Sequence, residues 1–132
     1  MSSAIKDITF EYAVIRVVPR VEREEFINAG VILYAKQQNF IKCLINLDQA
    51  RCKCLFESAD VDEIKLHLES FRGIAMGTNL DHPVASYDFG ERFRWLTAAR
   101  STIIQSGPVH PGKSDNPEGV IQRLFQDLVL GD

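Results

Sequence analysis

The sequence predicts a single α+β domain in which a mostly antiparallel sheet of about four strands packs against two main helices. Three segments rich in Val, Ile, Phe and Tyr follow one another within the first 47 residues, which is typical of strands joined by short turns. Two later segments carry apolar residues at helical spacing. The chain has 132 residues, 45% of them hydrophobic, which suits one core and is too few for two ordinary domains. We therefore expect one domain over residues 1–132.

The first strand is predicted over residues 8–18, where apolar side chains occupy both alternating faces. Such a strand is covered on both sides of the sheet. Pro19 ends it, because proline has no N–H to continue a ladder.

The second and third strands are predicted over residues 29–35 and 40–47, joined by the polar residues 36–39 as an antiparallel hairpin. Gly30 indicates a bulge or a close backbone approach. A further strand is predicted over residues 101–106.

The two helices are predicted over residues 60–71 and 117–129. Asp60 with Glu63 forms a capping pattern before the first, and Asn116 followed by Pro117 is typical of the start of the second. Residues 73–90 hold several turn formers and predict a long irregular connection.

Composition excludes several classes of function. The net charge of −3 argues against a protein that coats nucleic acid or an anionic membrane, since both tasks need excess positive charge. No apolar run is long enough to span a bilayer, and the first ten residues lack the apolar stretch of a signal peptide. We expect a cytoplasmic protein.

The three cysteines, Cys43, Cys52 and Cys54, are expected to be reduced and to pack as small apolar groups. One residue separates Cys52 from Cys54, where zinc knuckles usually have two, and the histidines are scattered. We therefore expect no metal and no cofactor.

Two segments have a composition that packing in the hydrophobic core does not explain. The first spans residues 16–30, where Arg16, Arg20, Glu24 and Asn28 could contribute to a ligand site at one edge of the sheet. The alternative interpretation is a network of surface ion pairs, because three arginines and three glutamates lie together there.

The second segment spans residues 91–110 and carries the only tryptophan. Its candidate ligand-binding residues are Arg92, Arg94, Trp95, Arg100, Ser101, Thr102, Gln105 and His110. A guanidinium fork matches carboxylate or phosphate, and neutral donors can complete the site. The alternative is a short helix anchored by Phe93, Trp95 and Leu96 whose arginines pair with acidic helix faces.

No common catalytic motif is present: the chain lacks a phosphate-binding glycine loop, a nucleophile elbow and paired metal-binding histidines. His110 could act as a general base, although a lone loop histidine is more often only a hydrogen-bonding group.

Both segments resemble the bacterial family known as domain of unknown function 3037. The resemblance rests on residues 12–20 (YAVIRVVPR) and their continuation to Gly30, and on residues 92–96 (RFRWL), 100–105 (RSTIIQ) and 108–110. It covers about residues 10 to 129 and implies no catalytic residue. It does imply a partner, because genes of this family often lie beside a gene for a kinase-like protein similar to HipA toxins.

Two functions follow as hypotheses. The first is an accessory or regulatory module that binds a protein partner, such as a HipA-like kinase, or an anionic ligand through Arg92, Arg94, Arg100, Ser101 and Thr102. The second is an enzyme acting on a phosphorylated or nucleotide substrate, with Arg16, Arg20, Arg94 and Arg100 as an anion clamp and His110 or Glu24 as the acid or base. Single-stranded nucleic acid stacking on Trp95 is a third, disfavoured by the net charge.

Overall fold

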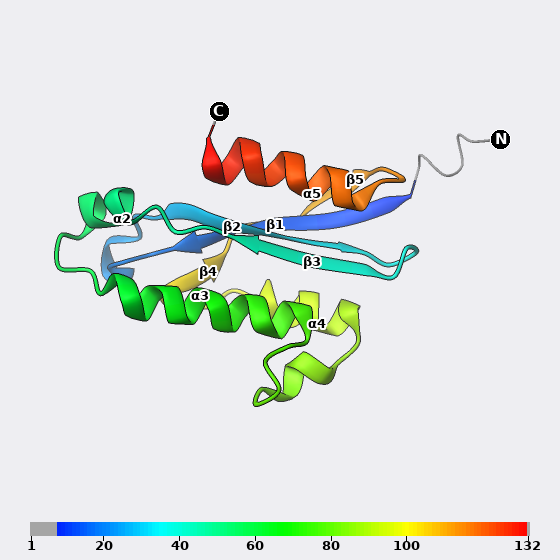
Figure 1. Ribbon diagram of the computed structural model, residues 1–132, viewed down its shortest axis with the longest axis horizontal. Coiled ribbons are helices and arrows are strands. Elements are labelled where there is room, and N and C mark those ends of the chain that lie inside the picture. Colours follow the sequence, from blue (N-terminus) through cyan, green and yellow to red (C-terminus); the bar gives the residue numbers. More distant parts are fainter. Residues whose placement is uncertain (1–7, 132) are drawn as a thin grey trace.

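The computed structural model describes residues 8–131 and has the predicted α+β class, with helices on both faces of an antiparallel sheet (Figure 1). The strands are β1 (Thr9–Val17), β2 (Ile27–Ala35), β3 (Phe40–Ile45), β4 (Ile104–Ser106) and β5 (His110–Lys113). The α-helices are α2 (Gln49–Leu55), α3 (Val61–Met76), α4 (Phe89–Leu96) and α5 (Pro117–Phe125). Two short 3-10 helices, η1 (Val21–Arg23) and η2 (Pro83–Ser86), and a π-helix, η3 (Gln126–Leu130), complete the fold.

β1 lies in the middle of the sheet, with β2 and then β3 on one side. On its other side β4 pairs with residues 15–17 and β5 with residues 9–12, so these two short strands share one edge of β1. The N–H of Gly107 donates to the Val14 carbonyl oxygen at 2.8 Å in the gap between them. The predicted fourth strand therefore begins later, at Ile104, and a fifth strand follows it.

The pairing of β1 with β2 is interrupted by a bulge, as Gly30 suggested. Ile15 pairs with Gly30 and Arg16 pairs with Asn28, which leaves Ala29 as the extra residue. A Cβ at Gly30 would lie 2.7 Å from the Leu44 carbonyl oxygen, so only glycine fits there without a shift. The bulge sets Asn28 directly beside Arg16.

Each face of the sheet has its own core, which confirms that β1 is covered on both sides. Ala13, Ile15 and Val17 pack on the face covered by α3 and α4, together with Phe93 and Leu96 of α4. Phe10 and the β2 residues Val31 and Leu33 pack on the opposite face, under α5 and η3.

The two helices predicted from the sequence are present with changed ends. The Asp60 side chain accepts a hydrogen bond from the Glu63 N–H, and α3 then runs five residues past the predicted end at residue 71, to Met76. It passes through Gly73 and stops at Gly77, whose positive φ of 76° suits glycine. Asn116 caps α5, and the predicted helix continues past Phe125 as η3.

Two parts of the sequence hold more structure than predicted. α2 begins at the Asp48 cap in a stretch for which no element was expected. Residues 73–90 are not an irregular connection, since they hold the end of α3, η2 and the start of α4.

All three cysteines are free: Cys43 and Cys52 are buried and Cys54 is exposed. Burial raises the pKa of the Cys43 thiol to about 12, which keeps it protonated at neutral pH. Within residues 8–131, no helix combines the length and apolar character needed to cross a bilayer.

Candidate functional site

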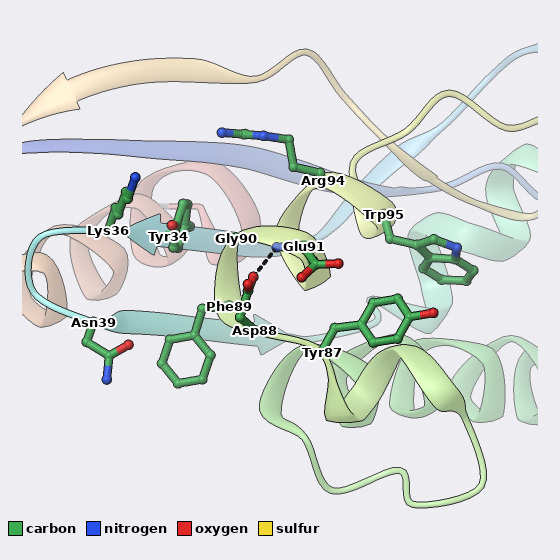
Figure 2. Close-up of a pocket in the computed structure, with 10 residues that line it drawn as sticks. All are labelled: Tyr34, Lys36, Asn39, Tyr87, Asp88, Phe89, Gly90, Glu91, Arg94 and Trp95. Carbon is green, nitrogen blue, oxygen red and sulfur yellow. Dashed lines mark hydrogen bonds between the residues drawn. The ribbon is translucent and has the colours of Figure 1, made fainter.

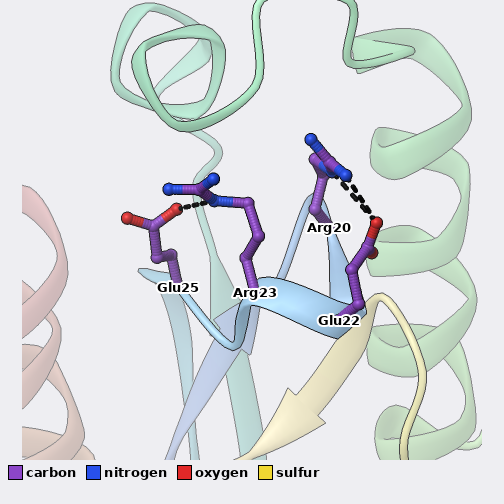
Figure 3. Close-up of polar contacts among 4 residues, drawn as sticks. All are labelled: Arg20, Glu22, Arg23 and Glu25. Carbon is purple, nitrogen blue, oxygen red and sulfur yellow. Dashed lines mark hydrogen bonds and ion pairs between the residues drawn. The ribbon is translucent and has the colours of Figure 1, made fainter.

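The charged turn between β1 and β2 neutralises itself. Arg20 pairs with Glu22 and Arg23 pairs with Glu25, both at 2.7 Å, and Figure 3 shows them as two separate pairs. The bonded guanidinium groups lower the pKa of both Glu22 and Glu25. This part of the first segment follows the alternative interpretation, a set of exposed ion pairs.

The other candidate residues of that segment take no part in these pairs. Glu24 is exposed, with φ of 58°. The Asn28 amide donates to the Leu128 carbonyl oxygen at 3.0 Å. Arg16 lies over the Phe26 ring at 4.1 Å and makes no hydrogen bond or ion pair with residues 8–131.

The second segment begins with α4, the short helix that the alternative interpretation anticipated. Asp88 caps it by accepting a hydrogen bond from the Glu91 N–H at 2.8 Å, which lowers the Asp88 pKa. The neighbouring Asp88 raises the pKa of Glu91. Phe93 and Leu96 are buried against the sheet, whereas Trp95 is 38% exposed and does not anchor the helix.

Arg92 has a structural position. Its Nε donates to the Tyr87 carbonyl oxygen at 2.7 Å and its Nη1 to that of Ala75 at 3.3 Å, in the last turn of α3. A cation suits the end of a helix, where unpaired carbonyls concentrate negative charge. Arg92 therefore ties α4 to α3 and is not available to a ligand in this arrangement.

Arg94 lies on the outer side of α4, where its Nη1 is 3.3 Å from the Glu11 Oε1. It also lines an open hollow of about 740 Å³ (Figure 2). Figure 2 shows Tyr87 and Trp95 at one end of this hollow and Lys36 and Asn39 at the other. Gly90 forms part of the wall, and a Cβ there would lie only 2.9 Å from the Tyr34 hydroxyl oxygen.

Arg100 and Trp95 form a compact pair. The Arg100 guanidinium lies 4.0 Å from the centre of the Trp95 ring and donates to the Trp95 carbonyl oxygen. The His82 ring packs edge-on against the indole, 4.8 Å away between ring centres. The indole is thus held in place from two sides although part of it faces solvent.

A second hollow, of about 550 Å³, lies between α3 and the segment that follows α4. Four predicted site residues line it: Trp95, Arg100, Ser101 and Thr102. Its apolar wall includes Phe71, Ile74 and Ile103, and its polar rim includes His67 and Ser70. The Thr102 hydroxyl is engaged with the Ile104 carbonyl oxygen at 2.7 Å.

The remaining candidates lie elsewhere. Gln105 donates to the Thr102 carbonyl oxygen and is paired in register with Arg16. His110 begins β5 and packs against Tyr12, with 5.2 Å between ring centres. His110 lines neither hollow.

The arginines after residue 90 do not point into one shared hollow. Arg94 and Arg100 line different hollows, Arg92 is turned to backbone carbonyls, and Arg16 and Arg20 line neither. The four-arginine clamp that the enzyme hypothesis needs is therefore not assembled. Trp95, by contrast, lines both hollows and joins them into one surface.

Several lining residues were missed from the sequence, among them Tyr34, His67, Ser70 and Tyr87. Only Tyr87 could have been found from the sequence, because it is an aromatic residue in a segment predicted to be irregular. The rest belong to elements read as core, and nothing in their local pattern indicates a hollow. Among residues 8–131, no three His, Cys, Asp or Glu side chains gather in a way that could hold a metal ion.

Comparison with known proteins yields a family and no characterised relative. No curated protein matches the chain, and neither does any solved structure. One family model, described as protein of unknown function (DUF3037), matches residues 12–129 and so includes both charged segments and the Trp95 region. On that match, the chain belongs to the DUF3037 family.

Proposed function

We propose that this chain is a bacterial, cytosolic accessory module that binds a partner protein through the surface around Trp95. This Trp95 surface consists of Tyr87, Arg94, Trp95, Arg100, Ser101 and Thr102. The observation that carries the proposal is the position of Trp95, a partly exposed indole that lines two adjoining open hollows with one arginine on each side.

The composition of the surface favours a protein partner. Trp, Tyr and Arg are the residue types that dominate binding energy at protein interfaces. Tyr87 is 43% exposed beside Trp95, and both hollows are open and have large apolar walls. A partner side chain entering either hollow would bury apolar area while keeping polar contacts at the rim.

The charges indicate what the partner presents. Arg94 is itself exposed and is bound only to the half-buried Glu11 carboxylate at 3.3 Å, so this contact can be exchanged for a carboxylate of the partner at little cost. The Arg100 guanidinium pairs with no carboxylate among residues 8–131. An acidic, apolar segment of the partner therefore complements the Trp95 surface best.

The first partner to test is a HipA-like kinase encoded beside a family member, the partner that the family resemblance implies. Calorimetric titration of the purified kinase-like protein should give a saturable heat with the wild-type chain. Trp95→Ala should weaken binding about 100-fold and Arg100→Ala about tenfold, because truncated interface Trp and Arg residues have effects of this size.

Arg51→Ala is the matched control, since Arg51 is an exposed arginine on α2, at the far end of the sheet from α4 (Figure 1). The affinity of the Arg51→Ala variant for the kinase-like protein should equal that of the wild type. Equal affinity of all four proteins would contradict the assigned surface, and no binding by the wild type would contradict the assigned partner.

A further inference from the structure

Arg16 occupies an unusual position on the α5 side of the sheet, away from the Trp95 surface. Its neighbours Ile15 and Val17 face the core under α3, so the alternation of the strand directs Arg16 to the opposite face. Asn28, its partner across β2, reaches the Leu128 carbonyl oxygen of η3 on that same face.

The Arg16 guanidinium is held in place by its surroundings. It lies over the Phe26 ring at 4.1 Å, and Gly107 passes so close that a Cβ there would lie 3.2 Å from Cζ, Nε and Nη2. The absence of a side chain at Gly107 is what leaves room for the group. The guanidinium therefore packs between the Phe26 ring and the backbone at Gly107.

This guanidinium nevertheless lacks an acceptor. Three arginines are half-buried, and Arg92 and Arg100 both donate to backbone carbonyl oxygens. Arg16 has no hydrogen bond or ion pair with residues 8–131, and its Nε is buried without a partner. The two Nη groups are not among the buried atoms and likewise have no acceptor among residues 8–131, so they are the donors that a ligand can reach.

Two residues with neutral amides are paired with Arg16 in the sheet. Antiparallel pairing places Asn28 on one side of Arg16 and Gln105 on the other, and directly paired residues share a face. Each amide nitrogen makes one hydrogen bond, to Leu128 and to Thr102, which leaves a second N–H on each. Of the three glutamates of the turn, Glu22 and Glu25 are engaged with Arg20 and Arg23, and Glu24 is exposed (Figure 3).

We propose that Arg16, Asn28 and Gln105 form a binding site for a small oxyanion, a phosphate or carboxylate group. The two Nη groups of the guanidinium bind two of its oxygens, and the second amide N–H groups bind its sides. Phe26, which is 43% exposed, then provides an apolar surface for the part of the ligand that carries the oxyanion. Carboxylate and phosphate share this recognition chemistry, and the experiment separates them.

The test is a nuclear magnetic resonance titration that follows the side-chain Nε–Hε signal of Arg16 and the amide signals of Asn28 and Gln105. Inorganic phosphate and sodium acetate are added in separate arms at constant ionic strength, with chloride as the third arm. We expect saturable shifts of these signals with phosphate or acetate and none with chloride. The responding arm identifies the oxyanion.

Arg16→Lys keeps the charge and loses the fork, so its affinity should fall about tenfold, as for the loss of one charged hydrogen bond. The matched control Arg51→Lys should bind like the wild type. Gln105→Ala should weaken binding of the oxyanion severalfold. This variant provides the test of the site if Arg16→Lys does not fold. Linear shifts in all arms, or affinity unchanged in both Arg16→Lys and Gln105→Ala, would overturn the proposal and leave Arg16 as a stacking partner of Phe26.

Discussion

The arginines of the β1–β2 turn differ in their acceptors from Arg92 and Arg100, two of the arginines that follow residue 90. In the turn, Arg20 and Arg23 meet glutamates two positions away and remain exposed. After residue 90, Arg92 reaches a carbonyl of α3, and Arg100 lies over an indole. The role of an arginine therefore depends on the acceptor within its reach. Charged segments of similar composition form surface ion pairs in the β1–β2 turn, and structural or binding groups after residue 90.

Among these arginines, we expect Arg92 to contribute most to the stability of the fold. Arg92→Ala removes two charged hydrogen bonds to carbonyl oxygens at the junction of α3 and α4, and should lower the free energy of unfolding by about 2–3 kcal/mol. Urea denaturation followed by circular dichroism measures it. Arg72→Ala is the control, because Arg72 is exposed and only 3.9 Å from Glu69, and should cost at most about 0.5 kcal/mol. Equal losses of unfolding free energy in Arg92→Ala and Arg72→Ala would contradict the structural role of Arg92.

Arg94 should have an intermediate effect. It joins α4 to the half-buried Glu11 of β1 from an exposed position, so Arg94→Ala should lower the free energy of unfolding by less than about 1 kcal/mol. Glu11→Gln should cause a loss of similar size, because it removes the same pair from the other side. A loss as large as that of Arg92→Ala would mean that Arg94 is structural and not held ready for a partner.

The turn charges should have the smallest effect. The pKa of Glu22 and that of Glu25 are lowered in the folded chain, so their contribution is present above the ordinary glutamate pKa and fades as pH falls through the lowered values. The double variant Glu22→Gln with Glu25→Gln should thus match the wild type in acid and differ only slightly at neutral pH. Urea midpoints measured across pH test this. A gap that widens as the pH falls would contradict the sign.

Much of the fold could be predicted because the first three strands carry their pattern locally. Val, Ile and Tyr dominate β1 and β2, and the caps at Asp60 and Asn116 place two helices. β5 was missed because its sequence HPGK has no strand signal and it forms only by pairing with β1. α4 was left as an alternative because glycine and arginine dilute its pattern.

The candidate site could be predicted only in its local part. Trp95, Arg100, Ser101 and Thr102 are close in sequence and line one hollow. The opposite wall comes from α3, whose His67 and Ser70 looked like ordinary exposed positions of a core helix. The sequence pattern predicts Arg92 as a ligand-binding residue, whereas its side chain is bound to the carbonyl oxygens of Tyr87 and Ala75. These acceptors are brought to Arg92 by the tertiary fold, which the local sequence does not reveal.

The most direct test of the Trp95 surface uses the single tryptophan of the chain as its own reporter. The chain is labelled with 5-fluorotryptophan, which gives one fluorine signal, and the unlabelled HipA-like kinase is added. We predict that the signal shifts or broadens in proportion to the bound fraction, while Arg51→Ala behaves identically and Arg100→Ala needs about tenfold more partner. Binding that is detected by calorimetry but leaves the fluorine signal unchanged would contradict the account.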